Sequence, residues 1–282
     1  MNDSTERDGR PMTTVACAQL ALGVGDVAEN LAAAEEAIEA AARAGARVVV
    51  LPELANSGYV FASVAEARAL AEPLDGPTVT AWSAAARRHG VTLVAGLAEL
   101  DAEGLVRNSA VVIDPAGELR AVYRKVHLFG TEKDFFVPGD EAPPTVDIDG
   151  VGRIGVMVCY DLEFPEWVRR AALAGTELLC APVNWPLFPR PEGERPAEVT
   201  KAQAAAAGNR MYVAVADRVG DERGVVWTGG SVIVAPDGFP VAGRVPSAGP
   251  ALVLASCDLA QARDKSLGAH NDVLGDRRPE LY

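Results

Sequence analysis

The chain lacks the features that mark several classes of protein. No apolar run reaches the roughly 18 to 20 residues that cross a bilayer, and residues 1–11 are polar, without the apolar stretch of a secretory signal. Acidic residues outnumber basic ones by 39 to 26, which gives a formal net charge of −13 and disfavours nucleic acids and anionic membranes as partners. We therefore expect a cytoplasmic protein that binds neither a membrane nor a nucleic acid.

Motifs for cofactors, metals and disulfides are also missing. The chain has no P-loop, no G-x-G-x-x-G fingerprint and no G-x-S-x-G turn. Its four cysteines form no C-x-x-C pair and have no metal-ligand spacing. We therefore expect no cofactor, no metal and no disulfide. Cys17, Cys180 and Cys257 lie in apolar, strand-like segments and are interpreted as core residues.

What remains is the composition of an ordinary globular protein, with 49% hydrophobic and 23% charged residues among 282. A chain of this length can bury a sizeable core. No compositional break or Ser/Gly-rich linker divides it. We therefore predict one domain over residues 12–267, with a disordered lead over residues 1–11 and a polar tail over residues 268–282.

Strand-like and helical patterns alternate along this domain, which favours the α/β class. Apolar, β-branched runs predict strands at 13–20, 47–51, 91–100, 106–114, 119–125, 151–160, 177–183, 211–219, 225–238 and 251–259. Ala-rich periodic stretches predict helices at 27–44, 63–71, 78–89, 164–175 and 196–209. Asp26 is expected to cap the first helix, and Gly45 to end it. Long loops remain at 126–144 and 182–196, and the second is interpreted as either a lid or a surface excursion.

Four polar residues stand out because each lies at, or just past, the end of a predicted strand. Glu53 follows RVVVLP, Lys125 closes LRAVYRK, and Cys159 closes RIGVMVC. Glu132 lies in the loop after Lys125. Open α/β sheets build active sites from such strand ends. A thiol, two carboxylates and an ammonium in these places indicate nucleophilic catalysis on an acyl group.

The local context of three of these residues suggests their chemistry. Cys159 is the candidate nucleophile, because a strand gives way there to the polar turn 160–163 and then to a helix. Exposed N–H groups at such a turn favour a thiolate and can receive an oxyanion. Glu53 is bordered by apolar segments, and desolvation would raise the pKa of its carboxyl toward that of a general base. Lys125 would keep its proton between carboxylates and act as an electrophile.

Local sequence leaves two questions open. Glu132 reads equally well as a solvated loop residue, and Asp134 competes with it. The three histidines are alternative general bases. However, His89 ends a predicted helix, His270 lies in the polar tail, and the position of His127 favours packing or hydrogen bonding. No histidine is compelling, which disfavours a papain-like Cys–His hydrolase.

Three segments of the chain together resemble the nitrilase superfamily of carbon–nitrogen hydrolases. They are Leu51-Pro52-Glu53, residues 123–129 (YRKVHLF) and residues 159–166 (CYDLEFPE). The likeness extends from ACAQL near the start of the chain to residues 276–282. The stretch HLFG…FFVPGD, followed by VCYDLEFPE, is most similar to small bacterial aliphatic amidases, including those that act on ω-amino amides.

The resemblance implies a role for each candidate residue. Glu53 would be the general base and Cys159 the nucleophile, while Lys125 and the backbone N–H of Tyr160 would hold the oxyanion. Glu132, seven positions after Lys125, matches the second glutamate of the family amidases. The resemblance also implies a four-layer α-β-β-α sandwich, homodimers paired through helices, and a C-terminal tail that packs on the partner subunit.

The expected activity is hydrolysis of a small aliphatic carboxamide to a carboxylic acid and ammonia through a cysteine thioester. A nitrilase or an N-carbamoyl-type amidohydrolase would use the same Glu-Lys-Cys triad. The alternative of another class is a catalytically silent binding protein on the same fold. Tyr59, Phe136, Asn184 and Trp185 are candidates for lining the acyl pocket, with ordinary packing as their alternative.

Overall fold

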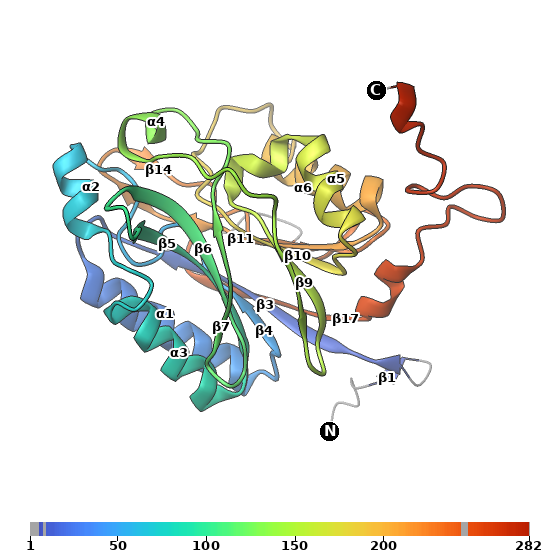
Figure 1. Cartoon of the computed structure of the whole chain (residues 1–282), viewed down its shortest axis with the longest axis horizontal. Helices are drawn as coiled ribbons and strands as arrows, with labels where there is room; N and C mark the ends of the chain where they lie inside the picture. Colours follow the sequence, from blue (N-terminus) through green and yellow to red (C-terminus); the bar gives the residue numbers. More distant parts are fainter. Residues whose placement is uncertain (1–5, 8–9, 244–247, 282) are drawn as a thin grey trace.

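Two β-sheets face each other at the centre of the molecule (Figure 1). The structure is a computed structural model that describes residues 6–7, 10–243 and 248–281. Sheet one has the strand order β12-β3-β4-β5-β6-β7, and β17 also pairs with β3. Sheet two has the order β16-β15-β11-β10-β9-β8.

The elements have the following bounds. Sheet one contains β3 (Thr13–Ala21), β4 (Val48–Val50), β5 (Thr92–Leu100), β6 (Val106–Ile113), β7 (Leu119–Arg124), β12 (Arg218–Val219) and β17 (Ala251–Cys257). Sheet two contains β8 (Thr145–Ile148), β9 (Gly152–Val156), β10 (Leu178–Pro182), β11 (Tyr212–Ala216), β15 (Val232–Val234) and β16 (Pro240–Ala242). The α-helices are α1 (Val27–Arg43), α2 (Val64–Leu70), α3 (Pro77–His89), α4 (Glu132–Phe135), α5 (Pro165–Leu173) and α6 (Ala197–Asn209). Short strands β13 (Asp221–Glu222) and β14 (Val225–Val226) form a separate pair.

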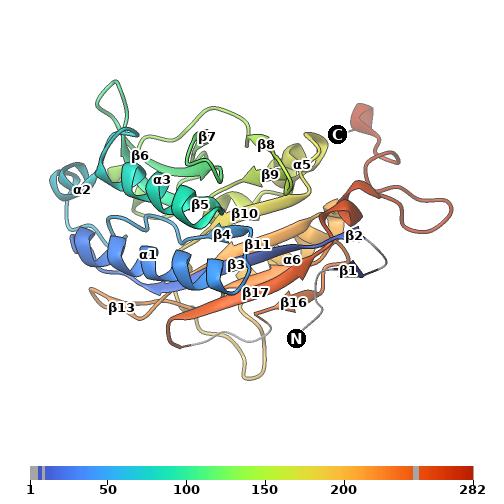
Figure 2. The ribbon, with the colours of Figure 1, turned by 90° about the horizontal axis from the view of Figure 1, so that it is seen from below.

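Helices cover the outer face of each sheet, which confirms the predicted four-layer α-β-β-α sandwich and its single domain. α1 and α3 lie against sheet one, and α5 and α6 lie against sheet two (Figure 2). The side chains of β3 show how the layers form, since they alternate between faces. Val15 and Cys17 join the core between the sheets, whereas Ala16 and Ala18 join the core beneath α1 and α3. Cys180 also belongs to the core between the sheets, as predicted.

The strand predicted at 151–160 is too long. β9 ends at Val156, and Cys159 begins a 3-10 helix, η1 (Cys159–Glu163). Cys159 has a φ of +47°, which lies in the left-handed region and is incompatible with a continuing strand. The nucleophile candidate therefore lies in a turn after the strand and not on the strand itself.

The strand predicted at 211–219 is two strands that belong to different sheets. β11 lies in sheet two, whereas β12 pairs with β3 of sheet one. The break falls at Asp217, whose carboxylate accepts hydrogen bonds from the backbone N–H groups of Trp185, Arg218 and Gly230. The run 225–238 is likewise divided, into β14 and β15.

Smaller differences concern loops and caps. The predicted loop 126–144 contains the short helix α4, and the loop is followed by β8, an unpredicted strand that pairs with β9. Asp26 precedes α1, but its side chain makes no capping hydrogen bond. Instead, the side chain of Asn30 exchanges hydrogen bonds with the backbone of Gly23.

The two ends of the chain have different settings. Residues 6–7 and 10–11 pair as β1 (Glu6–Arg7) and β2 (Arg10–Pro11), whereas the rest of the predicted lead, 1–5 and 8–9, lies outside the described residues. After η2 (Leu259–Arg263), the C-terminal segment extends away from the body (Figure 1) and ends in η3 (Pro279–Leu281). Among the described helices, none combines the length and apolarity that crossing a bilayer requires.

Gly96 on β5 tests how closely the chain packs beside the candidate site. A Cβ added there would lie 2.4 Å from Cα of Glu53 and 2.6 Å from N of Leu54, so the backbone would have to move. We expect Gly96→Ala to lower the free energy of unfolding by about 3 kcal/mol in urea titrations. Gly249→Ala is the control, because its new methyl group meets nothing within 4 Å and should change stability by less than about 0.5 kcal/mol. Equal stability of the two variants would contradict the close approach.

Candidate active site

Strand ends from both sheets converge on one place. Glu53 follows β4 and Lys125 follows β7, both in sheet one. Cys159 and Asn184 follow β9 and β10, which are neighbouring parallel strands of sheet two. Two hydrogen bonds join the sheets here. The N–H of Glu53 donates to the carbonyl of Val183 at 3.4 Å, and Nδ2 of Asn184 donates to the carbonyl of Glu53 at 2.9 Å.

The ammonium of Lys125 lies between two carboxylates. Its Nζ is 2.7 Å from Oε1 of Glu53 and 2.7 Å from Oε1 of Glu132. All three residues are at most 2% exposed. Burial alone would lower the pKa of Lys125, but the charges of Glu132 and Glu53 outweigh it and raise that pKa above its ordinary value. The lysine therefore remains a cation.

The two carboxylate oxygens of Glu53 have different surroundings. Oε1 accepts hydrogen bonds from Nζ of Lys125 and from Nδ2 of Asn108, both at 2.7 Å. Oε2 is buried and has no hydrogen-bond partner among the described residues. Burial raises the pKa of Glu53 to about 7, although Lys125 and Asn108 both act to lower it. Glu53 thus holds a basic oxygen that no protein donor occupies.

Glu132 begins α4 and faces the interior. In addition to Lys125, its Oε1 accepts the hydroxyl of Tyr59 at 2.5 Å, and its Oε2 accepts the N–H of Phe129 at 3.0 Å. Asp134, the competing residue, is exposed. The structure therefore places Glu132, and not Asp134, beside Lys125.

Cys159 is buried, with 7% of its surface exposed, at the start of η1. Its thiol donates to the carbonyl of Asn184 at a Sγ–O distance of 3.9 Å. Burial, followed by the charge of Glu53, raises the pKa of this thiol well above its usual value, and Lys125 opposes the rise. This direction is opposite to the expectation that the turn favours a thiolate, because burial and the charges of Glu53 and Glu132 all raise the pKa of the thiol.

Tyr59 is held by a buried ion pair. Oε2 of Glu222 accepts the backbone N–H groups of Tyr59 and Val60 at 3.0 and 2.8 Å. Glu222 is paired with the buried Arg218 at 2.7 Å, and the guanidinium of Arg218 lies 4.8 Å from the ring centroid of Trp227. The ring of Trp227 meets that of Tyr59 edge-on, with centroids 5.3 Å apart. The analysis of the sequence did not identify Arg218 or Glu222. Arg218 follows the apolar run 211–216, which is a signal for burial, whereas Glu222 lies in the polar stretch 220–224.

The other predicted pocket residues have mixed settings. Phe136 packs in an apolar cluster against Phe61, with ring centroids 5.8 Å apart. Trp185 is buried, and its N–H donates to Asp217. Asn184 bonds the backbone of Glu53 at the site itself. Tyr160, whose N–H was the expected oxyanion donor, directly follows Cys159 in η1 and is partly exposed.

The contacts and positions of the three histidines differ from those expected of a general base paired with Cys159. Nδ1 of His127 is 2.7 Å from Oδ1 of Asp161, and its ring stacks on Phe164 with centroids 3.8 Å apart. His89 ends α3 in the outer helical layer, and His270 is exposed in the tail. The hydrogen-bonding role expected of His127 is therefore the one the structure shows.

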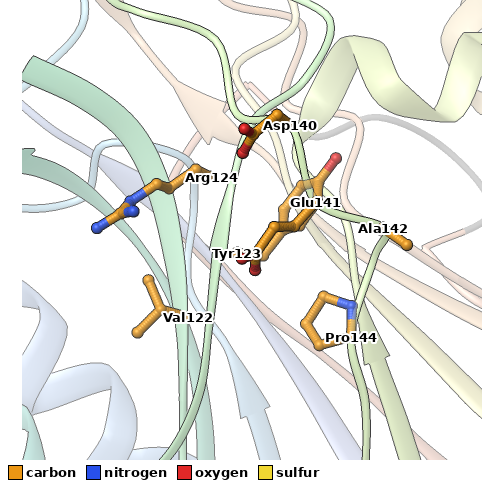
Figure 3. A pocket seen from close by; sticks show the side chains of 7 residues that line it. All are labelled: Val122, Tyr123, Arg124, Asp140, Glu141, Ala142 and Pro144. Carbon is orange, nitrogen blue, oxygen red and sulfur yellow. The ribbon is translucent and has the colours of Figure 1, made fainter.

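Other hollows and clusters lie outside this site. A cavity of about 160 Å³ lies between β7 and residues 140–144. Figure 3 shows the side chains that line it, which are Val122, Tyr123, Arg124, Asp140, Glu141, Ala142 and Pro144. None of the four candidate catalytic residues lines it. Within the described residues, no group of three or more histidine, cysteine or acidic side chains has an arrangement that could hold a metal ion.

Comparison with known proteins identifies the family. The model of the carbon–nitrogen hydrolase family matches residues 14–265. A nitrilase from Pyrococcus abyssi is 38% identical over 274 residues, which cover 96% of this chain and 99% of the relative. A 2-oxoglutaramate amidase from Bacillus subtilis is 31% identical, covering 95% of this chain and 99% of the relative. The chain belongs to the carbon–nitrogen hydrolase family, within the nitrilase superfamily.

Solved structures agree with this assignment. An amidase from Nesterenkonia sp. is 30% identical and superposes with a TM-score of 0.80, covering 100% of this chain and 98% of that one. In a variant of the amidase from Nesterenkonia sp. AN1, acrylamide has added to the active-site cysteine. That structure is 31% identical to this chain, with a TM-score of 0.78 and coverage of 95% and 98%. The family model and the solved structures thus assign this chain to the same superfamily, and one of these structural relatives has an active-site cysteine.

Removing the cation should expose the cost of burying two carboxylates. We expect Lys125→Met to lower the free energy of unfolding by about 3–5 kcal/mol at pH 8. The loss should be smaller at pH 5, because the pKa of Glu53 would rise further without the cation and its carboxyl would be neutral in the folded state at acid pH. A carboxyl whose pKa is higher in the folded state than in the unfolded state makes the free energy of unfolding fall as the pH rises. Urea titrations at both pH values measure the difference.

Lys133→Met is the matched control, since Lys133 lies next to Glu132 but is exposed. Its stability should stay within about 0.5 kcal/mol of the wild type at either pH. A Lys125→Met defect that does not depend on pH would contradict the buried charge cluster.

Proposed function

We propose that this chain is an amidase that hydrolyses small aliphatic carboxamides to carboxylic acids and ammonia through a thioester on Cys159. The observation that carries the proposal is the buried Lys125 ammonium between Glu53 and Glu132, with one oxygen of Glu53 unoccupied. Amidase-named relatives and structures of similar length support the same activity.

In the first half of the reaction, Oε2 of Glu53 takes the thiol proton and the sulfur attacks the amide carbon. The oxyanion that forms is held by the ammonium of Lys125 and the backbone N–H of Tyr160. Losing one such donor typically costs about 10²–10³-fold in turnover. A thiol with a raised pKa is consistent with this order of steps, because the proton transfers to Glu53 only as the sulfur attacks.

In the second half, Glu53 returns the proton to the departing nitrogen, so that ammonia leaves and the thioester remains. Glu53 then takes a proton from water, and the resulting hydroxide attacks the thioester carbon. Collapse of the tetrahedral intermediate releases the acid and expels Cys159 as a thiolate, which takes the proton back from Glu53. Glu132 holds Lys125 throughout and orients the amide, with Tyr59 fixing its carboxylate.

A nitrilase is the second candidate, favoured by the name of the 38% identical relative from Pyrococcus abyssi. It would use the same residues but would add the thiol to a nitrile and hydrolyse a thioimidate. An N-carbamoyl amidohydrolase would likewise keep the triad. A silent binding protein is disfavoured, because burying an ion cluster without a function is costly.

We also propose that the protein works as a homodimer in the cytoplasm. A groove of about 660 Å³ lies between α5 and α6 and presents both acidic and basic side chains, including Glu166 and Arg170. A face with both signs of charge suits a twofold interface, because the same face of a second copy can place acidic residues against its basic ones and basic residues against its acidic ones. Leu173 on this face is half exposed. The extended tail, residues 268–282, is proposed to pack on the same partner (Figure 1).

Replacing the nucleophile tests the activity directly. We expect wild-type protein to release ammonia from acetamide and propionamide, and Cys159→Ala to lose at least about 10³-fold of that rate. Cys257→Ala is the control, because that buried thiol lies at the end of β17 and should leave turnover unchanged. Parallel assays with propionitrile and with N-carbamoyl compounds separate the alternatives. Undiminished ammonia release by Cys159→Ala would refute the proposal.

The pKa of Glu53 predicts the acid side of the pH profile. The free base must be ionised, so kcat/KM should fall about tenfold per pH unit below about pH 7, the pKa to which burial raises Glu53. Asn108 donates to Glu53 and stabilises its ionised form, so Asn108→Ala should move this limb to higher pH. A limb near pH 4, or a downward shift in Asn108→Ala, would be inconsistent with Glu53 as the base.

A further inference from the structure

The proposed site is divided between the two sheets. Lys125 leaves the end of β7 in sheet one, and Cys159 leaves the end of β9 in sheet two. Hydrogen bonds within a sheet fix the spacing of its own strands. They do not fix the distance between an ammonium on one sheet and a sulfur on the other. Contacts between the sheets must do so.

Asp161 makes such contacts with both of its carboxylate oxygens. Oδ2 accepts the hydroxyl of Tyr123 at 2.8 Å and the N–H of Val158 at 3.2 Å. Oδ1 accepts the N–H of His127 at 3.0 Å and lies 2.7 Å from its Nδ1. Asp161 is fully buried. Because a carboxylate only accepts hydrogen bonds, Nδ1 of His127 carries a proton and donates it to Oδ1.

These partners bracket the two reacting groups. Tyr123 and His127 each lie two residues from Lys125, one before it and one after it. On the other sheet, Val158 and Asp161 enclose Cys159, and the N–H of Asp161 also donates to the carbonyl of Val158 at 3.1 Å. One carboxylate therefore ties the segment of the cation to the turn of the nucleophile.

Neighbouring side chains hold the partners in place. Nε1 of Trp167 donates to the hydroxyl of Tyr123 at 2.9 Å, which directs the hydroxyl proton toward Asp161. The ring of His127 is stacked on Phe164 and meets Trp167 edge-on. Both aromatic residues come from the start of α5 or the residue before it. The Tyr123 and His127 side chains that bond Asp161 are therefore themselves restrained.

We propose that Asp161 is a positioning residue, which holds the Cys159 turn in its left-handed conformation and at a fixed distance from Lys125. A non-glycine residue with a φ of +47° persists only when its surroundings determine it, and the Asp161 contacts with Val158 supply that restraint. The inference rests on the proposed function, since it concerns how the sulfur meets the cation that stabilises its reaction. His127 and Tyr123 act through Asp161.

The test compares Asp161→Asn with Glu177→Gln. Glu177 is also a buried carboxylate, which accepts the backbone N–H of Arg153 in sheet two and pairs with Arg263 of η2, but it lies at the opposite end of β10 from Asn184. For Asp161→Asn we expect kcat to fall about 10²-fold with KM within about threefold, because misplaced reacting groups slow the chemical step. Glu177→Gln should lose stability in urea and keep its kcat.

A second measurement needs no amide turnover. Alkylation of Cys159 by iodoacetamide, followed by mass spectrometry at a series of pH values, measures how readily the thiol ionises. The charged groups that face the thiol and affect its ionisation are Glu53, Lys125 and Glu132. Asp161→Asn should shift the midpoint of alkylation upward by about one pH unit, since the sulfur loses part of its attraction to the Lys125 cation. Glu177→Gln should alkylate with the wild-type midpoint.

If Asp161→Asn does not fold, Tyr123→Phe decides the matter, because it removes only one of the donors to Asp161. Its kcat should fall about fivefold and its alkylation midpoint should rise. The proposal would be overturned if Asp161→Asn folds, has a kcat no lower than that of Glu177→Gln and keeps the wild-type alkylation midpoint. If Asp161→Asn is unfolded, a Tyr123→Phe variant with wild-type kcat and midpoint would overturn it. Activity retained by Cys159→Ala would instead refute the amidase mechanism itself.

Discussion

The buried ammonium of Lys125 is the interaction on which the rest of the site depends. Two carboxylates lie within hydrogen-bond distance of it in a place closed to water, and neither Glu53 nor Glu132 could be buried as an anion there without a cation between them. The same ammonium keeps Glu53 from becoming so weak an acid that it would never ionise. Stability and reactivity therefore rest on one charge, and the raised pKa of Glu53 is what remains after the cation has offset part of the desolvation.

A site divided between two sheets needs bonds that cross from one to the other. Asn184 reaches from sheet two to the backbone of Glu53, and Asp161 joins the Cys159 turn to the segment around Lys125. Asp217 marks the point where the chain itself passes between sheets, and it collects the N–H groups of three separate backbone positions. In each case a short polar side chain without water contact does the joining, because only buried hydrogen bonds retain their direction and strength in this interior.

Much of this arrangement could be predicted from the sequence, because apolar periodicity and strand ends are local properties. The α/β class, most of the strands and helices, and the positions of Glu53, Lys125 and Cys159 near strand ends follow from such patterns, whereas the four-layer sandwich was implied by the resemblance to the nitrilase superfamily. The position of Glu132 did not follow from such patterns, since its loop context is that of a solvated residue and its burial arises from contacts with Lys125 and with Tyr59, which lies 73 positions away in the chain. The early end of β9 was missed for a similar reason. Residues 156–159 are apolar enough for a strand, and the hydrogen bond that the Asp161 carboxylate accepts from the N–H of Val158 at the turn is not visible in the sequence pattern.

The neutral state of the Cys159 thiol has a consequence for how the protein meets oxidants. Peroxides and other soft electrophiles react with thiolates, and susceptibility follows thiolate character and access. A sulfur that is buried and protonated at rest offers little of either. In the proposed mechanism, the thiolate would form only as a substrate carbon meets the sulfur beside Glu53. Burial and the raised pKa therefore predict a low susceptibility of Cys159 to sulfenic acid formation.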